Sequence, residues 1–182
     1  MGTIIGCAAA ESYAATALDT PSAILNSTRQ LRAVMHTIVE NGGINVERLA
    51  HYLCETSNET PFDDYTELVL DGYRKTGGGE HVEQDRISYN VFKDHHEKKI
   101  AVMRNESDEK RLATHDNTSL IRSVLTSLFN DHDSFSFATC MTTHADHRCI
   151  SASVCISHVL NMIMSGFKIG VCEAIAGTTR II

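Results

Sequence analysis

The sequence Met-Thr-Thr-His-Ala-Asp-His-Arg-Cys, which begins at residue 141, gathers the side chains best suited to chemistry in this chain. It leads directly into an apolar stretch whose spacing predicts a helix. His144, Asp146 and His147 can ligate zinc if further ligands come from elsewhere. Asp146 can instead cap the helix and complement its dipole. In a third interpretation, His144 and Arg148 bind a phosphate or ribose beside the helix N-terminus.

Size and charge limit the classes of protein to which the chain can belong. Its 182 residues fit one domain, and a hydrophobic fraction of 42% is enough for a core. The formal net charge is −7 and the basic residues are scattered, which argues against a nucleic-acid surface. The same acidic balance disfavours binding to anionic membranes. The apolar runs are shorter than the roughly 20 residues of a membrane-spanning helix.

Cysteine usage and the N-terminus indicate a cytoplasmic or other intracellular location. The six cysteines include no Cys-x-x-Cys pair, and most lie in apolar helical contexts. Buried reduced thiols are therefore expected, as in a reducing compartment. Residues 1–10 are apolar but have no positively charged start, so they are interpreted as a helix start and not as a signal peptide.

Helical periodicity recurs along the chain and strand-like alternation is nearly absent, so we expect an all-α protein with one domain over residues 1–182. Ser27 or Thr28 is expected to cap a helix that runs to Glu40 and stops before two glycines, and Ser134 is expected to cap a later one. A polar, irregular excursion is expected at about 55–117, with two local helices inside it. The expected helices are 4–18, 27–40, 46–54 with Asn45 as its cap, 65–73, 85–98, one from Asn117 that is broken at residues 130–133, 134–141, a central one from Cys149 to Gly166, and 169–176.

Several segments, in order, resemble the ADP-ribosylglycohydrolase family. Residues 138–154, Ala-Thr-Cys-Met-Thr-Thr-His-Ala-Asp-His-Arg-Cys-Ile-Ser-Ala-Ser-Val, are similar to the family's T-H-x-x-x-R loop and the long helix that follows it. Residues 101–104, Ala-Val-Met-Arg, resemble its N-G-A-x-M-R segment. Residues 2–9 resemble its opening helix, and residues 31–53 its second and third helices. In patches, the resemblance covers about two thirds of the chain.

The resemblance implies a fold, an activity and a set of site residues. The family is an all-helical orthogonal bundle that hydrolyses the glycosidic bond between ADP-ribose and an acceptor such as a protein side chain, with two Mg²⁺ ions. Carried over to this chain, the ADP-ribose cleft is lined by Met103, Arg104, Thr143 and His144. Asp146 and Arg148 are their neighbours. ADP-ribose or an ADP-ribosylated protein is therefore the expected partner.

This chain departs from the family at its metal ligands. The T-D-D-T segment that starts the family's second helix is replaced here by Asn-Ser-Thr-Arg-Gln over residues 26–30, and the C-terminal D-x-D-T segment does not occur. Asp63 and Asp64 are an adjacent acidic pair, but they come after the third expected helix, where a solvated turn is the better interpretation. The chain is also expected to be shortened at its C-terminal end. Two functions follow: a hydrolase of this type, or a non-catalytic relative like the crystallin J1 branch, with a structural or ADP-ribose-binding role.

Overall fold

The computed structural model describes residues 25–76, 86–94 and 118–166, and every regular element in these ranges is helical. The expected all-α class is therefore confirmed. None of the helices in the described part combines the length and apolar character needed to cross a membrane. The helices expected at 4–18 and 169–176 lie outside the described residues. The elements are α2 (Leu25–Asn41), α3 (Val46–Glu59), α4 (Asp64–Lys75), a helical segment over 86–94, the 3₁₀ helix η1 (Leu120–Arg122), α6 (Ser123–Thr126), α7 (His132–Met141) and α8 (His147–Met164).

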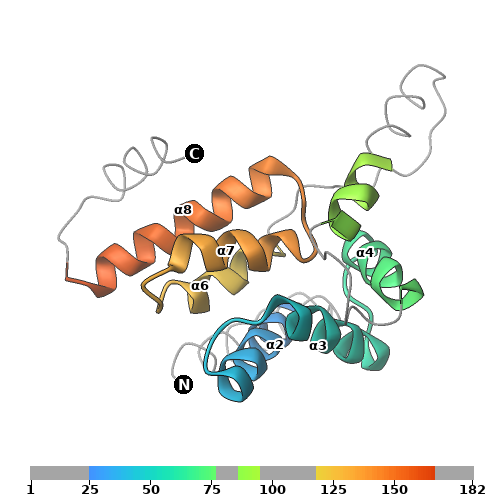
Figure 1. Ribbon diagram of the computed structural model, residues 1–182, viewed down its shortest axis with the longest axis horizontal. Coiled ribbons are helices and arrows are strands. Elements are labelled where there is room, and N and C mark those ends of the chain that lie inside the picture. Colours follow the sequence, from blue (N-terminus) through green and yellow to red (C-terminus); the bar gives the residue numbers. More distant parts are fainter. Residues whose placement is uncertain (1–24, 77–85, 95–117, 167–182) are drawn as a thin grey trace, which may run out of the picture.

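The helices form two groups that lie next to each other (Figure 1). The first group contains α2, α3 and α4, with the segment 86–94 beside α4 (Figure 1). In the second group, α7 and α8 run side by side and α6 lies against both. The groups are joined where α2 contacts η1 and α6, and where α3 contacts α7.

Local side-chain chemistry explains the ends of the first three helices. Asn45 caps α3 as expected, because its side chain accepts a hydrogen bond of 3.0 Å from the backbone N–H of Arg48. Asp63 caps α4 by accepting from the backbone N–H of Thr66 at 2.8 Å. Gly42, with φ of 68°, ends α2 in the left-handed conformation that glycine adopts without strain. The expected cap at Ser27 or Thr28 is wrong, since α2 already begins at Leu25.

The apolar core lies mostly in the first helix group, and Leu125 of α6 joins it from the second. The two local helices expected at 65–73 and 85–98 are confirmed by α4 and by the segment 86–94, whereas the helical residues 55–59, which extend α3, were expected to be irregular. The apolar positions of α4 are separated by acidic residues, which made the segment look polar although one face is apolar. The core side chains are Leu31, Ala33, Val34, Leu49, Ala50, Leu53, Cys54, Phe62, Tyr65, Val69, Leu70, Tyr73, Ile87 and Leu125.

The second helix group has a more polar interior. Ser123 and Ser136 share a hydrogen bond of 2.9 Å between their hydroxyls, and Thr126 and Ser157 share one of 3.1 Å. The expectation that α8 is central is wrong, because serines interrupt its apolar face and its last residues are exposed. α7 begins two residues before the expected cap at Ser134. The interior of this group therefore combines hydroxyl pairs with a few buried apolar side chains.

Candidate functional site

Residues 142–146 form the turn between α7 and α8, which we call the Thr-His loop, and its first residues are buried in the protein interior. Thr143 and His144 have at most 1% of their surface exposed. The guanidinium of Arg122 donates a hydrogen bond of 2.6 Å to Thr143 Oγ1, which also shares one of 2.8 Å with His144 Nδ1. The His144 ring packs against Tyr65, with ring centroids 5.3 Å apart. These contacts link η1, α4 and the loop, so the two side chains have a defined role in packing.

The backbone of the same loop is held by the first helix group. The Tyr73 hydroxyl, from α4, donates a hydrogen bond of 2.8 Å to the carbonyl of Thr142. The Ser88 hydroxyl, from segment 86–94, donates to the carbonyl of Met141. The loop is therefore the place where the two helix groups are joined by buried polar contacts.

The end of the loop carries the accessible charge. Asp146 is 1% exposed and caps α8 by accepting a hydrogen bond of 2.9 Å from the Arg148 backbone N–H, so its expected capping role is confirmed. Its carboxylate also accepts from the Arg148 guanidinium at 2.6 Å, and this hydrogen bond raises the pKa of Arg148. The Arg148 side chain is 55% exposed. A ligand can thus reach Arg148 directly, whereas Asp146 acts by orienting it.

The zinc interpretation of this loop does not fit its geometry. His144 is buried, whereas the His147 side chain is 86% exposed. Among the described residues, these two histidines and Asp146 do not form a set of converging ligand atoms. Met103 and Arg104, the other residues assigned to the ADP-ribose cleft, lie outside the described residues.

The start of α2, where the resemblance places a magnesium site, holds a guanidinium group. Arg29 donates hydrogen bonds to the carbonyls of Thr56 and Thr60 at the C-terminal end of α3. It also lies 4.4 Å above the ring of Phe62, and burial lowers the pKa of Arg29. Mg²⁺ requires oxygen ligands such as carboxylates, and a cation beside Arg29 would be repelled. The residues at this position therefore do not fit a magnesium ion.

A pocket of about 390 Å³ opens beside the same helix start. Asn26 and Ser27 contribute an amide and a hydroxyl from α2. The other walls are mostly apolar. The pocket thus offers a few polar groups on an apolar surface, as small-molecule sites do. The lining residues are Asn26, Ser27, Thr118, Leu120, Ile121, Val124 and Ile156.

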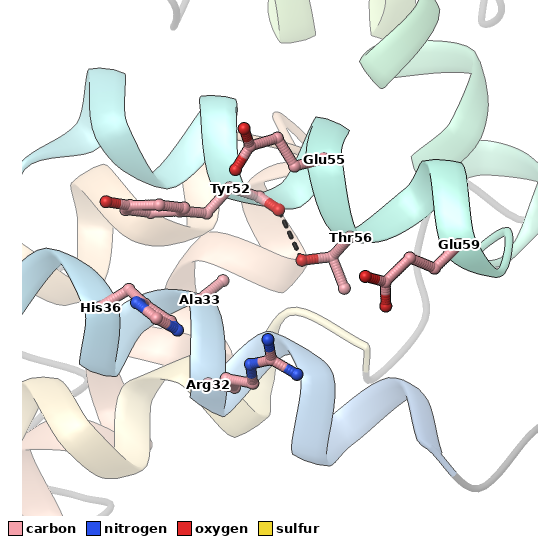
Figure 2. Close-up of a pocket in the computed structure, with 7 residues that line it drawn as sticks. All are labelled: Arg32, Ala33, His36, Tyr52, Glu55, Thr56 and Glu59. Atoms are coloured by element: carbon pink, nitrogen blue, oxygen red, sulfur yellow. Dashed lines mark hydrogen bonds between the residues drawn. The ribbon is translucent and has the colours of Figure 1, made fainter.

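A second pocket, of about 140 Å³, lies between α2 and α3 (Figure 2). Arg32 and His36 line it from α2, and Tyr52, Glu55 and Glu59 line it from α3. Opposite charges from the two helices therefore border the same small space. None of the described residues assigned to the ADP-ribose cleft lines this pocket.

Three side chains that the sequence did not single out converge between α7 and α8. They are His132, Asp133 and His158, whose candidate ligand atoms all lie within 4.8 Å of one another. The sequence offers only a weak signal for this group, an adjacent His-Asp pair and a third residue on another helix. In the sequence that pair lies within residues 130–133, which are expected to break a helix.

Comparisons with protein-family models, with curated proteins and with solved structures find no match to this chain. The resemblance to ADP-ribosylglycohydrolases thus depends on the residues quoted above.

Proposed function

We propose that this chain is a non-hydrolytic relative of the ADP-ribosylglycohydrolases that binds ADP-ribose without magnesium. The resemblance supplies the class of ligand. The observation that carries the loss of hydrolysis is Arg29, whose guanidinium donates to the C-terminal carbonyls of α3 where the family has carboxylate ligands. A fixed positive charge at this position excludes a divalent cation. Without the two ions, the proposed protein cannot activate water in the family's way.

The proposed binding surface runs along α8 from the pocket beside α2 to Arg148. Ile156 lines the pocket, and Arg148 lies eight residues earlier on the same helix, about 12 Å away along its axis. An elongated nucleotide can contact both places. The apolar walls suit the adenine ring, and the hydroxyl of Ser27 suits a ribose. The exposed guanidinium of Arg148 suits the diphosphate, because guanidinium groups bind phosphate oxygens in a bidentate manner.

We further propose an intracellular, reducing location, and an ADP-ribosylated protein as the alternative ligand to free ADP-ribose. The support for the location is that Cys54, Cys140 and Cys155 carry free thiols.

Calorimetry with free ADP-ribose, in EDTA and in excess Mg²⁺, tests the proposal. We expect equal affinities in both buffers and no release of ADP-ribose from a modified protein. Arg148→Gln should weaken binding about tenfold, the low end for a charged hydrogen bond at an exposed position. Arg48→Gln, an exposed arginine at the start of α3, is the matched control and should bind as the parent does.

Each alternative predicts a different result. Magnesium-dependent release of ADP-ribose would mean that the chain is a hydrolase and that carboxylates elsewhere supply the ligands. If ADP-ribose binds in neither buffer, the ligand class is wrong. A structural role of the helical protein would then be the better explanation.

A further inference from the structure

Two helices of the second group bring two imidazoles and a carboxylate together. His132 and Asp133 are the first residues of α7, and His158 lies in the C-terminal half of α8. α7 and α8 pack side by side with a short turn between them, which places the start of α7 beside this part of α8 (Figure 1). We propose that His132, Asp133 and His158 form a binding site for a divalent transition-metal ion, with Zn²⁺ as the preferred ion.

The distances between the three groups are close to the separations between ligand atoms around a tetrahedral zinc ion, with one oxygen of Asp133 near each histidine. His132 Nε2 lies 3.2 Å from His158 Nδ1 and 3.2 Å from Asp133 Oδ1. His158 Nδ1 lies 3.7 Å from Asp133 Oδ2. Zinc binds His nitrogen and carboxylate oxygen at about 2.0–2.2 Å, so tetrahedral ligands are separated by about 3.3–3.6 Å. An ion can therefore reach all three groups with small side-chain adjustments.

The backbone around the site is already fixed by hydrogen bonds. Ser157 directly precedes His158, and its hydroxyl donates a hydrogen bond of 3.4 Å to the carbonyl of His132. The same hydroxyl shares a hydrogen bond of 3.1 Å with Thr126 Oγ1. The two ring centroids of His132 and His158 are 5.4 Å apart. A site whose ligands are held in place before binding loses little conformational entropy when the ion arrives.

The metal-free alternative is a hydrogen bond between the two imidazoles with a neighbouring carboxylate. In this alternative the hydrogen-bonding capacity of one oxygen is not satisfied. Asp133 Oδ1 is a buried atom that accepts no well-aligned hydrogen bond from the described residues. A metal ion would use this oxygen and the lone pairs of both imidazoles together. Buried acceptors without well-aligned donors are costly, which favours an occupied site.

The donor set selects zinc over magnesium. Two imidazole nitrogens and one carboxylate oxygen suit Zn²⁺, whereas Mg²⁺ prefers oxygen ligands and water. The side chains of His132, His158 and Asp133 are 13%, 23% and 36% exposed, so water can approach one side of the site. Three protein ligands and one open position is the arrangement that zinc sites use to hold a water molecule.

Calorimetric titration of the full chain with Zn²⁺, after removal of metals with EDTA, tests the proposal. We expect saturable binding of one ion per chain, and a visible spectrum of tetrahedral nitrogen and oxygen coordination when Co²⁺ replaces Zn²⁺. His158→Ala and Asp133→Asn should each weaken binding by more than the roughly tenfold that loss of an outer contact costs.

His51→Ala is the matched control, because His51 forms a surface pair of 3.2 Å with Glu55 and belongs to no three-ligand group among the described residues. This variant should bind Zn²⁺ as the parent does. Unchanged binding in His158→Ala, equal losses in His158→Ala and His51→Ala, or no binding by the parent would each overturn the proposal. If His158→Ala does not fold, His158→Gln takes its place. A Zn²⁺-dependent rise in Tm that disappears in Asp133→Asn would support the same site, and a rise that persists in this variant would overturn it.

Discussion

Replacing Arg29 with Met tests the interpretation that a guanidinium stabilises the junction of α2 and α3. The substitution keeps the aliphatic stem and removes hydrogen bonds to the carbonyls of Thr56 and Thr60. A hydrogen bond from a charged donor contributes about 1.5 kcal/mol at the low end, and the contact with Phe62 about 0.5–1 kcal/mol. Part of this lost stabilisation is offset, because the variant no longer has to bury a charged guanidinium. We expect a net loss of about 2–3 kcal/mol.

Urea unfolding followed by circular dichroism measures this loss. For a chain of this length, about 2–3 kcal/mol corresponds to a fall in Tm of roughly 5–10 °C. Arg32→Met is the matched control, since Arg32 is an exposed arginine three residues later on α2. It should lie within about 0.5 kcal/mol of the parent. If Arg29→Met is as stable as Arg32→Met, the guanidinium does not hold the end of α3 and the argument against a cation at this position fails.

Three further substitutions or conditions test the packing. Tyr73→Phe removes a fully buried hydroxyl donor and should cost about 1–2 kcal/mol in urea unfolding, whereas Tyr89→Phe, at an exposed position, should change nothing. Gly72→Ala should destabilise by about 1 kcal/mol by the same assay, because the added Cβ would lie 2.8 Å from a methyl carbon of Ile87 and crowding outweighs the gain in helix propensity. Burial raises the pKa of Cys54 to about 11, so stability should fall between pH 9 and pH 11, by at most about 1.4 kcal/mol per pH unit, and the Cys54→Ala variant should show a smaller fall.

The helices were predictable where local chemistry decides their ends. Asn45 caps α3 by accepting a hydrogen bond from a backbone N–H three residues later, and Gly42 ends α2 because it adopts a positive φ. The length of α3 and the burial of α4 were not predictable in the same way. In both helices the polar residues face solvent on one side, while the other side packs against neighbouring helices. A polar composition alone does not show which side is buried. α8 was misjudged for the opposite reason, since its apolar composition suggested burial all round although Ile163 and Met164 are exposed.

The candidate site was predictable only in part. Asp146 was correctly assigned as a helix cap because capping depends on residues next to it in sequence. That Thr143 and His144 are buried depends on Arg122 and Tyr65, which are distant in sequence. The group of His132, Asp133 and His158 was missed because His158 lies 25 residues after Asp133 and meets the adjacent pair only when α7 packs on α8. Sequence spacing identifies sites within one helix or loop, and packing creates the others.

The contrast between the two helix groups gives the metal proposal a structural consequence. The first group is stabilised by a continuous apolar core, whereas the interior of the second has fewer buried apolar side chains and includes hydroxyl pairs, each contributing about 1 kcal/mol. The second group should therefore open locally at a lower free energy than the first. An ion bound by His132, Asp133 and His158 would tie the start of α7 to α8 and raise the cost of that opening by about 2.7 kcal/mol at a free concentration 100 times Kd.

Amide hydrogen exchange with and without Zn²⁺ measures this consequence. Protection should increase in α7 and α8 while that of α2, α3 and α4 stays nearly constant. His51→Ala should show the same pattern as the parent, and Asp133→Asn should show none. A uniform increase across all helices would mean that opening is global and that the two groups unfold as one unit. Increased protection confined to α3, where His51 lies, would instead assign the ion to the surface pair of His51 and Glu55.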